Sequence, residues 1–183
     1  MRRTDVRPTG IERTFHDHKI IVSKTDLKGR LTYVNRLFVE ISAFPSEDAL
    51  IGQPHNVIRH PDMPRAVYAL LWERIQAGHE MFSYVVNLAA DGAHYWVLAH
   101  ITPTLDGAGQ IIGYHSNRRA VTAAKVATIT ALYREISAAE RLHDNAREAV
   151  AAGRQVLAAT LAEAGMDYDE FIWSIINAED IAA

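Results

Sequence analysis

A change in residue usage near position 122 divides the chain into two parts that must fold differently. Residues 20–122 hold most of the glycines, prolines and Asp-Gly pairs, together with short runs of β-branched and aromatic residues. Residues 123–183 are rich in alanine and contain no proline. The first part therefore predicts a sheet with short connections, and the second predicts helices.

Five short runs with strand character lie in the first part. Asp-Gly pairs at 91–92 and 106–107, and an Asp…Gly turn at 26–29, separate successive runs as in β-hairpins. The predicted strands are residues 20–22, 31–34, 82–88, 94–102 and 110–118.

Helical patterns fill the space between the second and third predicted strands. Asn35 caps a short helix that ends near Ser42, and Pro45 begins another. A longer helix starts after Pro64 and ends at Gly78. The order of elements predicts an α+β fold, with a five-stranded antiparallel sheet, small helices over one face and a pocket between them.

Three domains are predicted: an amino-terminal arm (1–19), a sensor domain (20–122) and a helical carboxyl-terminal extension (123–183). The arm carries Arg2, Arg3, Arg7 and Arg13, and its first thirteen residues are interpreted as mobile and solvated. In the extension, an apolar stripe predicts a helix with one buried face, while the charged residues around it are expected in solvent. The stripe is Val126, Ile129, Tyr133, Ile136 and Leu142, and the charged set includes Glu135, Glu140 and Arg141.

Composition excludes several classes of function. The formal net charge is −3, so no basic excess indicates a nucleic-acid partner. The chain has no cysteine, which excludes disulfides, thiolate metal sites and a cysteine nucleophile. No apolar run is long enough for a membrane span, and no signal peptide is evident, so we expect a cytoplasmic protein. No catalytic constellation or metal-ligand spacing stands out, so we expect a protein that is not an enzyme.

Two motifs carry a family resemblance. The string Arg59-His60-Pro61-Asp62-Met63-Pro64, followed by Trp72, and the later run Asp91-Gly92…His94-Tyr95-Trp96-Val97 are the most specific parts. With Tyr33-Val34-Asn35, they resemble the flavin-binding PAS sensor domain of bacterial aerotaxis receptors over about residues 20–120. The resemblance implies a PAS fold, FAD as cofactor, and a role in sensing redox state or oxygen.

The resemblance also implies site residues. Arg59 is expected to pair with a flavin phosphate or the pyrimidine edge of the ring, His60 to bond to the ring, and Asp62 to orient either of them. A purely structural loop cap is the alternative. Weaker candidates near the cofactor are Asn35, Phe38, Tyr68 and Trp72.

Strand parity assigns the remaining candidates. Tyr95, Val97, Ala99 and Ile101 form an apolar face that should point to the pocket. Asn87 resembles an asparagine that contacts the flavin pyrimidine edge in related domains. His115 shares a face of its strand with Ile111, Gly113 and Asn117, and the resemblance to light-sensing PAS domains implies that this face points to the flavin. There His115 is expected to respond to flavin reduction or to ligate haem iron.

Three functions remain open from the sequence. The first is an FAD sensor that reports to an unidentified signalling protein. The second is a haem b gas sensor with His60 or His115 as axial ligand, and the third is a cofactor-free interaction module. A homodimer is expected through the outer sheet face or the C-terminal helix.

Overall fold

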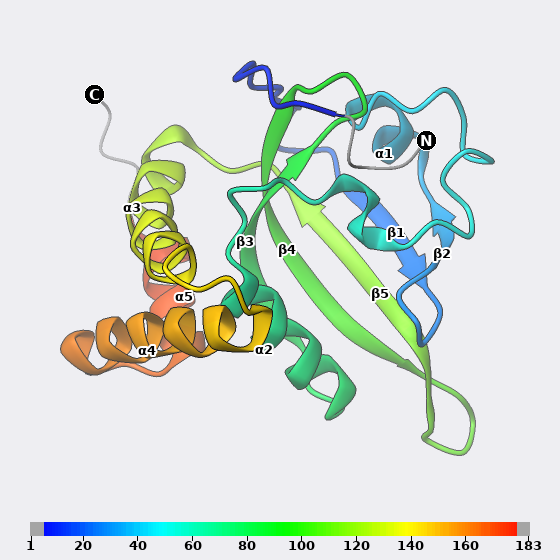
Figure 1. The fold of residues 1–183 in the computed structure, drawn as a ribbon. Coiled ribbons are helices and arrows are strands. Elements are labelled where there is room, and N and C mark those ends of the chain that lie inside the picture. Colours follow the sequence, from blue (N-terminus) through cyan, green and yellow to red (C-terminus); the bar gives the residue numbers. More distant parts are fainter. Residues whose placement is uncertain (1–5, 179–183) are drawn as a thin grey trace. The chain divides into compact units, whose positions relative to one another are not determined.

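A computed structural model describes residues 6–178 of the chain, so Arg2 and Arg3 lie outside the described residues. Two packing units are formed, Met1–His60 with Arg74–Ala120 and Pro61–Glu73 with Val121–Ala183. The elements (Figure 1) are β1 Ile21–Thr25, β2 Leu31–Val34, α1 Arg36–Ile41, the 3-10 helix η2 His55–Ile58, α2 Arg65–Gln76, β3 Met81–Leu88, β4 His94–Leu105, β5 Ile111–Arg119, α3 Ala123–Glu140, α4 Ala146–Ala164 and α5 Tyr168–Asn177.

The first unit is built on a five-stranded antiparallel sheet in the order β2-β1-β5-β4-β3. This confirms the predicted fold class, and each predicted strand is present. The turn after β3 contains Gly92 at φ 89°, a left-handed conformation that glycine adopts without strain. A Cβ at this position would lie 2.4 Å from the carbonyl oxygen of Arg7, so the glycine also permits a close backbone approach.

The two faces of the sheet differ in burial. Tyr95, Val97, Ala99 and Ile101 are all at most 8% exposed, whereas the residues between them on β4 are half-buried. Pairing places Ala99 opposite Arg118 of β5, and Arg118 contacts both η2 and α1. The small helices therefore cover the side that carries Tyr95 and Ala99, which we call the covered side. This confirms the prediction that these residues face the helices.

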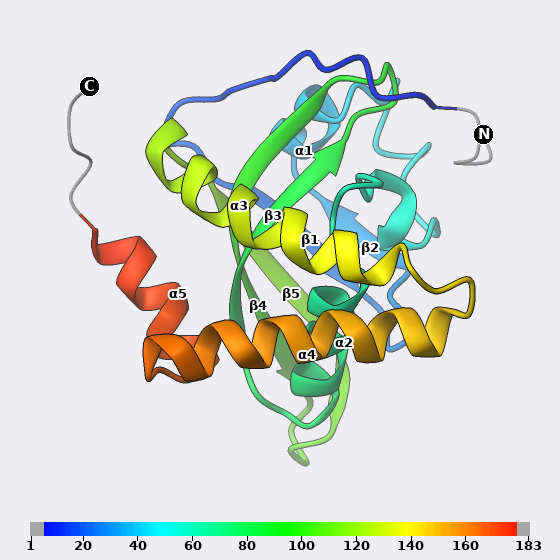
Figure 2. The ribbon, with the colours of Figure 1, turned by 60° about the vertical axis from the view of Figure 1, so that its left-hand side comes forward.

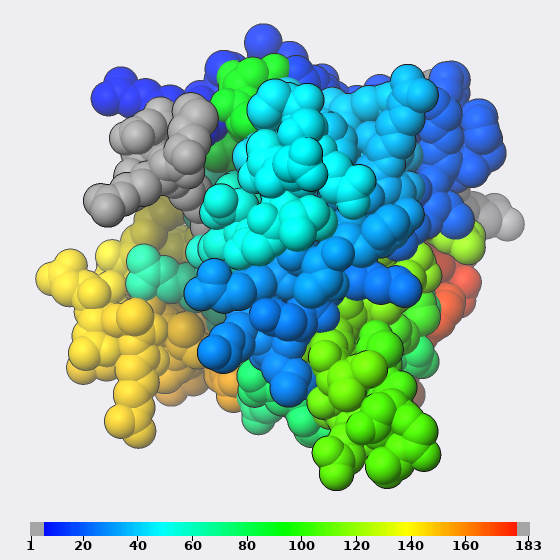
Figure 3. All heavy atoms as spheres, turned by 90° about the vertical axis from the view of Figure 1, so that its right-hand side faces the viewer, coloured from blue at the N-terminus to red at the C-terminus, as the bar shows by residue number. Residues whose placement is uncertain are grey.

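Local chemistry holds α1 on the covered side. The side-chain oxygen of Asn35 accepts hydrogen bonds from the backbone N–H groups of Phe38 and Val22, each 3.1 Å long, and its amide nitrogen donates to the carbonyl of Ile20. One side chain thus caps the helix and ties it to β1. Figure 3 shows the blue and cyan segments, from β1 to η2, gathered over this part of the first unit.

The amino-terminal segment extends the sheet beside β4. Arg13 donates its backbone N–H to the carbonyl of His94, and His94 donates in return to Ile11. The Arg13 guanidinium forms an ion pair with Asp91, which lowers the pKa of that carboxyl, and it also donates to the carbonyl of Ile41. Residues 9–13 are thus bonded to β4 rather than free of the first unit, although residues 9–12 remain exposed to solvent as predicted.

The second unit is helical, and Figure 2 shows α3 and α4 as long neighbouring helices, with α5 following α4. Asn145 caps α4, and Asp167 with Glu170 forms a capping box at the start of α5. Ile129, Tyr133 and Ile136 of the predicted stripe are buried. Leu142 is not part of it, because α3 ends at Glu140 and Leu142 is 83% exposed. Glu140, expected in solvent, is buried as well.

Residues 6–178 include no helix with the length and apolar character needed to cross a bilayer.

Candidate functional site

Asn87, at the end of β3, lies on the covered side because it pairs with Tyr95. The residue is 0% exposed, and both polar atoms of its carboxamide are without a hydrogen-bond partner among the described residues. Leaving a buried polar group unsatisfied costs about 1–3 kcal/mol. A carboxamide in this position offers one donor and one acceptor side by side to a molecule bound between sheet and helices.

Arg59 is placed next to Asn87 by the backbone. After η2 the chain is extended, and Arg59 pairs with Asn87 in an isolated antiparallel bridge at the outer edge of β3. Residues paired in this way direct their side chains to the same side of a sheet. The structure therefore brings Arg59 and Asn87 together on the covered side, as the prediction of a shared site requires.

A cluster around Arg118 lies on the same side, and the sequence prediction missed it. Arg118 is 3% exposed, and its guanidinium donates to Ser23 Oγ (2.9 Å) and to His55 Nε2. It also lies 5.4 Å from the centre of the Phe38 ring, within the range of a cation–π contact. Phe38, predicted near the cofactor, is fully buried in this cluster.

His55 is neutral in this environment. Burial of the imidazole and the neighbouring Arg118 charge lower its pKa from 6.5 to about 3. A neutral imidazole can accept the arginine hydrogen bond, whereas a protonated one would repel the guanidinium. Ser23 and His55 thus hold the Arg118 side chain on the covered side.

The prediction that His115 lies on the covered side is wrong. His115 pairs with Thr102, and Asn117 pairs with His100, which places both on the opposite face of the sheet. There His115 Nε2 lies 3.0 Å from Asn117 Oδ1. The cause is an irregularity in pairing between Thr104 and Leu105, where Ile112 is an extra residue on β5. One inserted residue moves every following side chain to the other face.

That shift explains why Arg118 was missed. With regular pairing from Leu105 opposite Ile111, His115 would lie opposite Ile101, on the covered side. The bulge instead brings Ser116 and Arg118 to the covered side. Gly113 marks the irregularity, because a Cβ there would lie 2.3 Å from the carbonyl oxygen of Thr25. A glycine in a strand interior next to a hairpin is the sequence signal that indicates a bulge.

His60 and Asn35 have structural partners. His60 follows Arg59 in extended chain, so it points to the opposite side, where its ring meets that of His94 edge-on at 5.8 Å. It is 6% exposed, and it anchors the loop in the core. Asn35, also predicted near the cofactor, uses its carboxamide to cap α1.

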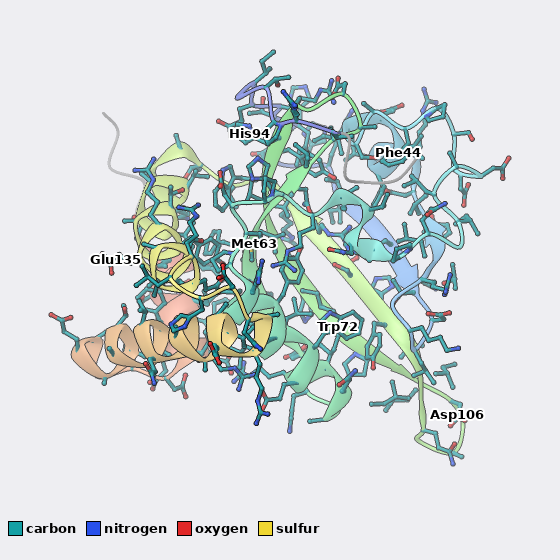
Figure 4. All side chains as sticks on the ribbon, in the orientation of Figure 1. Phe44, Met63, Trp72, His94, Asp106 and Glu135 are labelled. Carbon is teal, nitrogen blue, oxygen red and sulfur yellow. The ribbon has the colours of Figure 1, made fainter. Side chains whose placement is uncertain are left out.

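The other three predicted residues belong to the second unit. Asp62 lies 3.6 Å from Arg141 in an exposed ion pair. Tyr68 and Trp72 are four residues apart on α2, so they share one face of that helix, and both are half-buried. Figure 4 shows Met63 on the segment that leads into α2, and Trp72 on the helix itself.

Histidine placement bears on metal and haem chemistry. Within residues 6–178, no three His, Asp or Glu side chains are arranged to hold a metal ion. His115 and His60, the two histidines proposed as haem ligands, both point away from the covered side. His55 is on that side, with its Nε2 engaged by Arg118.

Comparison with known proteins identifies relatives of this arrangement. Residues 11–116 match the family model described as the PAS fold. The aerotaxis receptor of Escherichia coli (strain K12) is 37% identical over 130 residues, which make up 69% of this chain and 25% of the receptor. The nitrogen fixation regulatory protein of Klebsiella pneumoniae is 26% identical over 103 residues, 56% of this chain and 21% of that protein. The chain thus spans a quarter or less of these relatives.

Solved structures show the same fold. The light-state structure of the blue-light photoreceptor Aureochrome1 LOV has a TM-score of 0.56 at 19% identity, covering 63% of this chain and 91% of that one. The LOV domain from the Erythrobacter litoralis EL346 blue-light activated histidine kinase has a TM-score of 0.50 at 19% identity, covering 54% and 93%. At this identity the likeness concerns the fold alone.

Proposed function

Since this chain belongs to the PAS-fold family, whose model matches residues 11–116, we propose that it is a sensor that binds FAD on the covered side of the sheet and reports redox state or oxygen to a partner protein. The resemblance to the aerotaxis receptor, 37% identical over 130 residues, supports a role of the aerotaxis or energy-sensing type. The proposal assigns the chain a cytoplasmic location and no catalytic turnover.

The observation that carries the proposal is the Asn87 carboxamide, buried with neither polar atom partnered among the described residues. The pyrimidine edge of a flavin alternates carbonyl acceptors with a ring N–H donor. An asparagine carboxamide can donate to one and accept from the other, so the two groups are complementary. A bound flavin would therefore satisfy both atoms of Asn87.

The arginines supply the charge that a flavin needs. Arg59 neighbours Asn87 in the sheet extension, and Arg118 is fixed on the same side by Ser23 and His55. Guanidinium groups bind phosphate and carbonyl oxygens by paired hydrogen bonds. Flavin itself supplies reversible reduction, which changes the charge and hydrogen bonding of the ring. Arg118 would stabilise negative charge added to a flavin bound there, and His55 holds that arginine in place.

The haem alternative is less compatible with this geometry. An axial ligand needs an imidazole nitrogen directed at the haem iron. His115 and His60 face away from the covered side, and the Nε2 of His55 accepts a hydrogen bond from Arg118. These placements favour flavin over haem. A cofactor-free interaction module is the remaining alternative, and it leaves the burial of the Asn87 carboxamide without a physical reason.

Signal output requires a partner, which we propose to be a separate signalling protein or a second copy of this chain. The apolar residues Trp173 on α5 and Met166 before it are 44% and 39% exposed and offer contact area in the second unit. Homodimerisation through the outer sheet face or the C-terminal helix remains part of the proposal.

The absorbance spectrum of the purified protein tests the cofactor. We expect an absorbance band at about 450 nm from flavin, whereas haem would give a Soret band at about 400–430 nm. Chromatography of the released flavin against FAD and FMN standards identifies which flavin is bound.

Substitution in the loop tests the site. Arg59→Ala should lose most of the flavin while the circular dichroism spectrum stays that of the wild type, because Arg59 is only half-buried. The matched control is Arg36→Ala on the exposed side of α1, which should keep full occupancy. Colourless wild-type protein that takes up no added FAD would refute the proposal, and full occupancy in Arg59→Ala would remove Arg59 from the site.

A further inference from the structure

The first turn of α2 is capped by a residue from a distant helix. The backbone N–H groups of Arg65 and Ala66 donate to the two carboxylate oxygens of Glu140, at 2.9 and 2.8 Å. Glu140 is the last residue of α3, and it is 75 positions from Arg65 in the chain. The first amides of a helix have no partner within the helix, and a negative charge is favoured there. Pro64 precedes Arg65, and a proline side chain has no atom that could accept these hydrogen bonds.

This contact is buried and closely packed. Glu140 is 7% exposed and Ala66 is 0% exposed. Gly153 of α4 lies against both, since a Cβ at that position would be 2.6 Å from Glu140 Oε1 and 2.8 Å from the Ala66 Cβ. A buried carboxylate with two charge-assisted hydrogen bonds is costly to break, because the charge would be left uncompensated. The three residues Glu140, Ala66 and Gly153 form what we call the clasp.

Two exposed ion pairs flank the clasp. Arg154 lies 2.6 Å from Glu73 at the far end of this segment of α2, and Arg141 lies 3.6 Å from Asp62 before it. Exposed pairs of this kind contribute little stability individually. They link the segment to the end of α3 and to α4 on either side of the clasp.

The clasp lies just after the point where the chain passes from the first unit to the second. The chain passes from the first unit to the second between His60 and Pro61, directly after Arg59. Prolines at 61 and 64 stiffen the short segment between Arg59 and the first helical turn of α2. The segment from Arg59 to Arg65 is thus short and stiff, and at its end the Arg65 N–H donates to the carboxylate of Glu140.

We propose that Glu140 joins the amino-terminal end of α2 to α3 and α4 as one cooperative body, so that movement of the Arg59–Pro64 loop is passed to the C-terminal helices. The stimulus for that movement rests on the proposed flavin site, whereas the clasp itself does not. Glu140 is in this sense a positioning residue, which acts through the α2 amides and touches no cofactor.

Hydrogen exchange in the full chain without cofactor tests the clasp. Glu140→Ala should speed exchange of the Arg65 and Ala66 amides by about ten- to a hundredfold, with a matching loss of protection at the end of α3. Glu140→Gln keeps the shape and one acceptor oxygen, so it should fold if Glu140→Ala does not, and it should show a smaller effect in the same amides. Glu135→Gln, an exposed glutamate on the same helix, is the control and should leave these amides protected.

A double-mutant cycle tests the cooperativity. Gly153→Ala pushes α4 away from Glu140 and should also expose the Arg65 and Ala66 amides. If the clasp is one unit, Gly153→Ala adds almost nothing in the Glu140→Ala background, where the carboxylate that it would displace is already gone. Additive effects, or unchanged exchange in Glu140→Ala, would overturn the inference.

Hydrogen exchange of FAD-loaded protein tests the link to the cofactor separately. In protein loaded with FAD, reduction by dithionite should alter exchange in α3 and α4 of the wild type and of Glu135→Gln, and not in Glu140→Gln. A chain that binds no FAD but shows the non-additive cycle has the clasp without the proposed cofactor. A chain that binds FAD and shows additive effects has the proposed cofactor without the clasp.

Discussion

At the scale of single residues, two asparagine side chains of the first unit differ in their hydrogen bonding. The Asn35 carboxamide makes three hydrogen bonds to the backbone, whereas the Asn87 carboxamide makes none within residues 6–178. The sequence analysis placed both near the cofactor, since residue type alone does not distinguish a cap from a ligand contact. The difference depends on which backbone groups lie within reach, and that is fixed only by the folded chain.

Removing the unsatisfied amide should stabilise the cofactor-free protein. Asn87→Leu replaces a buried polar group by an apolar one of similar size, so we expect the free energy of unfolding to rise by about 1–2 kcal/mol. Asn35→Leu removes three satisfied hydrogen bonds and should lower it by about 1–3 kcal/mol. Urea unfolding of flavin-free samples measures both changes. A loss of stability in Asn87→Leu comparable to that in Asn35→Leu would mean that Asn87 is structural.

His55 predicts a pH dependence of stability. Its pKa is about 3 in the folded protein and 6.5 in the unfolded chain, so the unfolded chain binds the proton first as the pH falls. The contribution of neutral His55 to the free energy of unfolding is fully present above pH 6.5. It is lost progressively between pH 6.5 and 3. From pH 7.5 to 5.0 the loss attributable to His55 is about 2 kcal/mol.

The variant His55→Gln isolates this contribution, because glutamine keeps an acceptor for Arg118 and does not titrate. Unfolding free energies at pH 7.5 and 5.0 should differ by about 2 kcal/mol less in the variant than in the wild type. Equal pH dependence in the two proteins would show that His55 is protonated as readily in the folded state as in the unfolded chain.

At the scale of elements, sequence patterns predicted the strands well and one register wrongly. Asp-Gly turns were sufficient to predict the order of the strands along the chain, and the alternation on β4 was sufficient to predict its buried face. Both patterns are local in sequence. The β5 face depended on the pairing near Leu105, where one extra residue reverses the parity of everything that follows. A bulge is a property of two strands together, so the alternation along β5 alone did not reveal it.

The amino-terminal segment was missed for a related reason. Residues 9–13 have no strand pattern of their own, and they are ordered by pairing with backbone groups of β4 and by the Arg13–Asp91 ion pair. Arginine-rich composition predicted a mobile arm in solvent. Residues 9–12 are exposed, but partners distant in sequence hold the segment beside β4. The same holds for Glu140, whose buried position depends on the amides of α2.

At the scale of the whole molecule, the division into packing units does not follow the change in composition near residue 122. The segment Pro61–Glu73, which includes most of α2, packs with the C-terminal helices. The specific string Arg59–Pro64 thus spans the passage between the units. We expect a sensor of this design to couple its cofactor site to its output through that passage, by the chain and the clasp.

Titration of flavin-free protein with FAD tests the central claim most directly, with wild type and Asn87→Leu compared by calorimetry and by the shift in unfolding temperature. Wild type should bind FAD saturably, with an unfolding temperature that rises with FAD concentration, and Asn87→Leu should bind at least about tenfold more weakly, since it loses a pair of buried hydrogen bonds to the ligand. Equal affinity in the two proteins, or no binding by the wild type, would contradict an FAD site at Asn87.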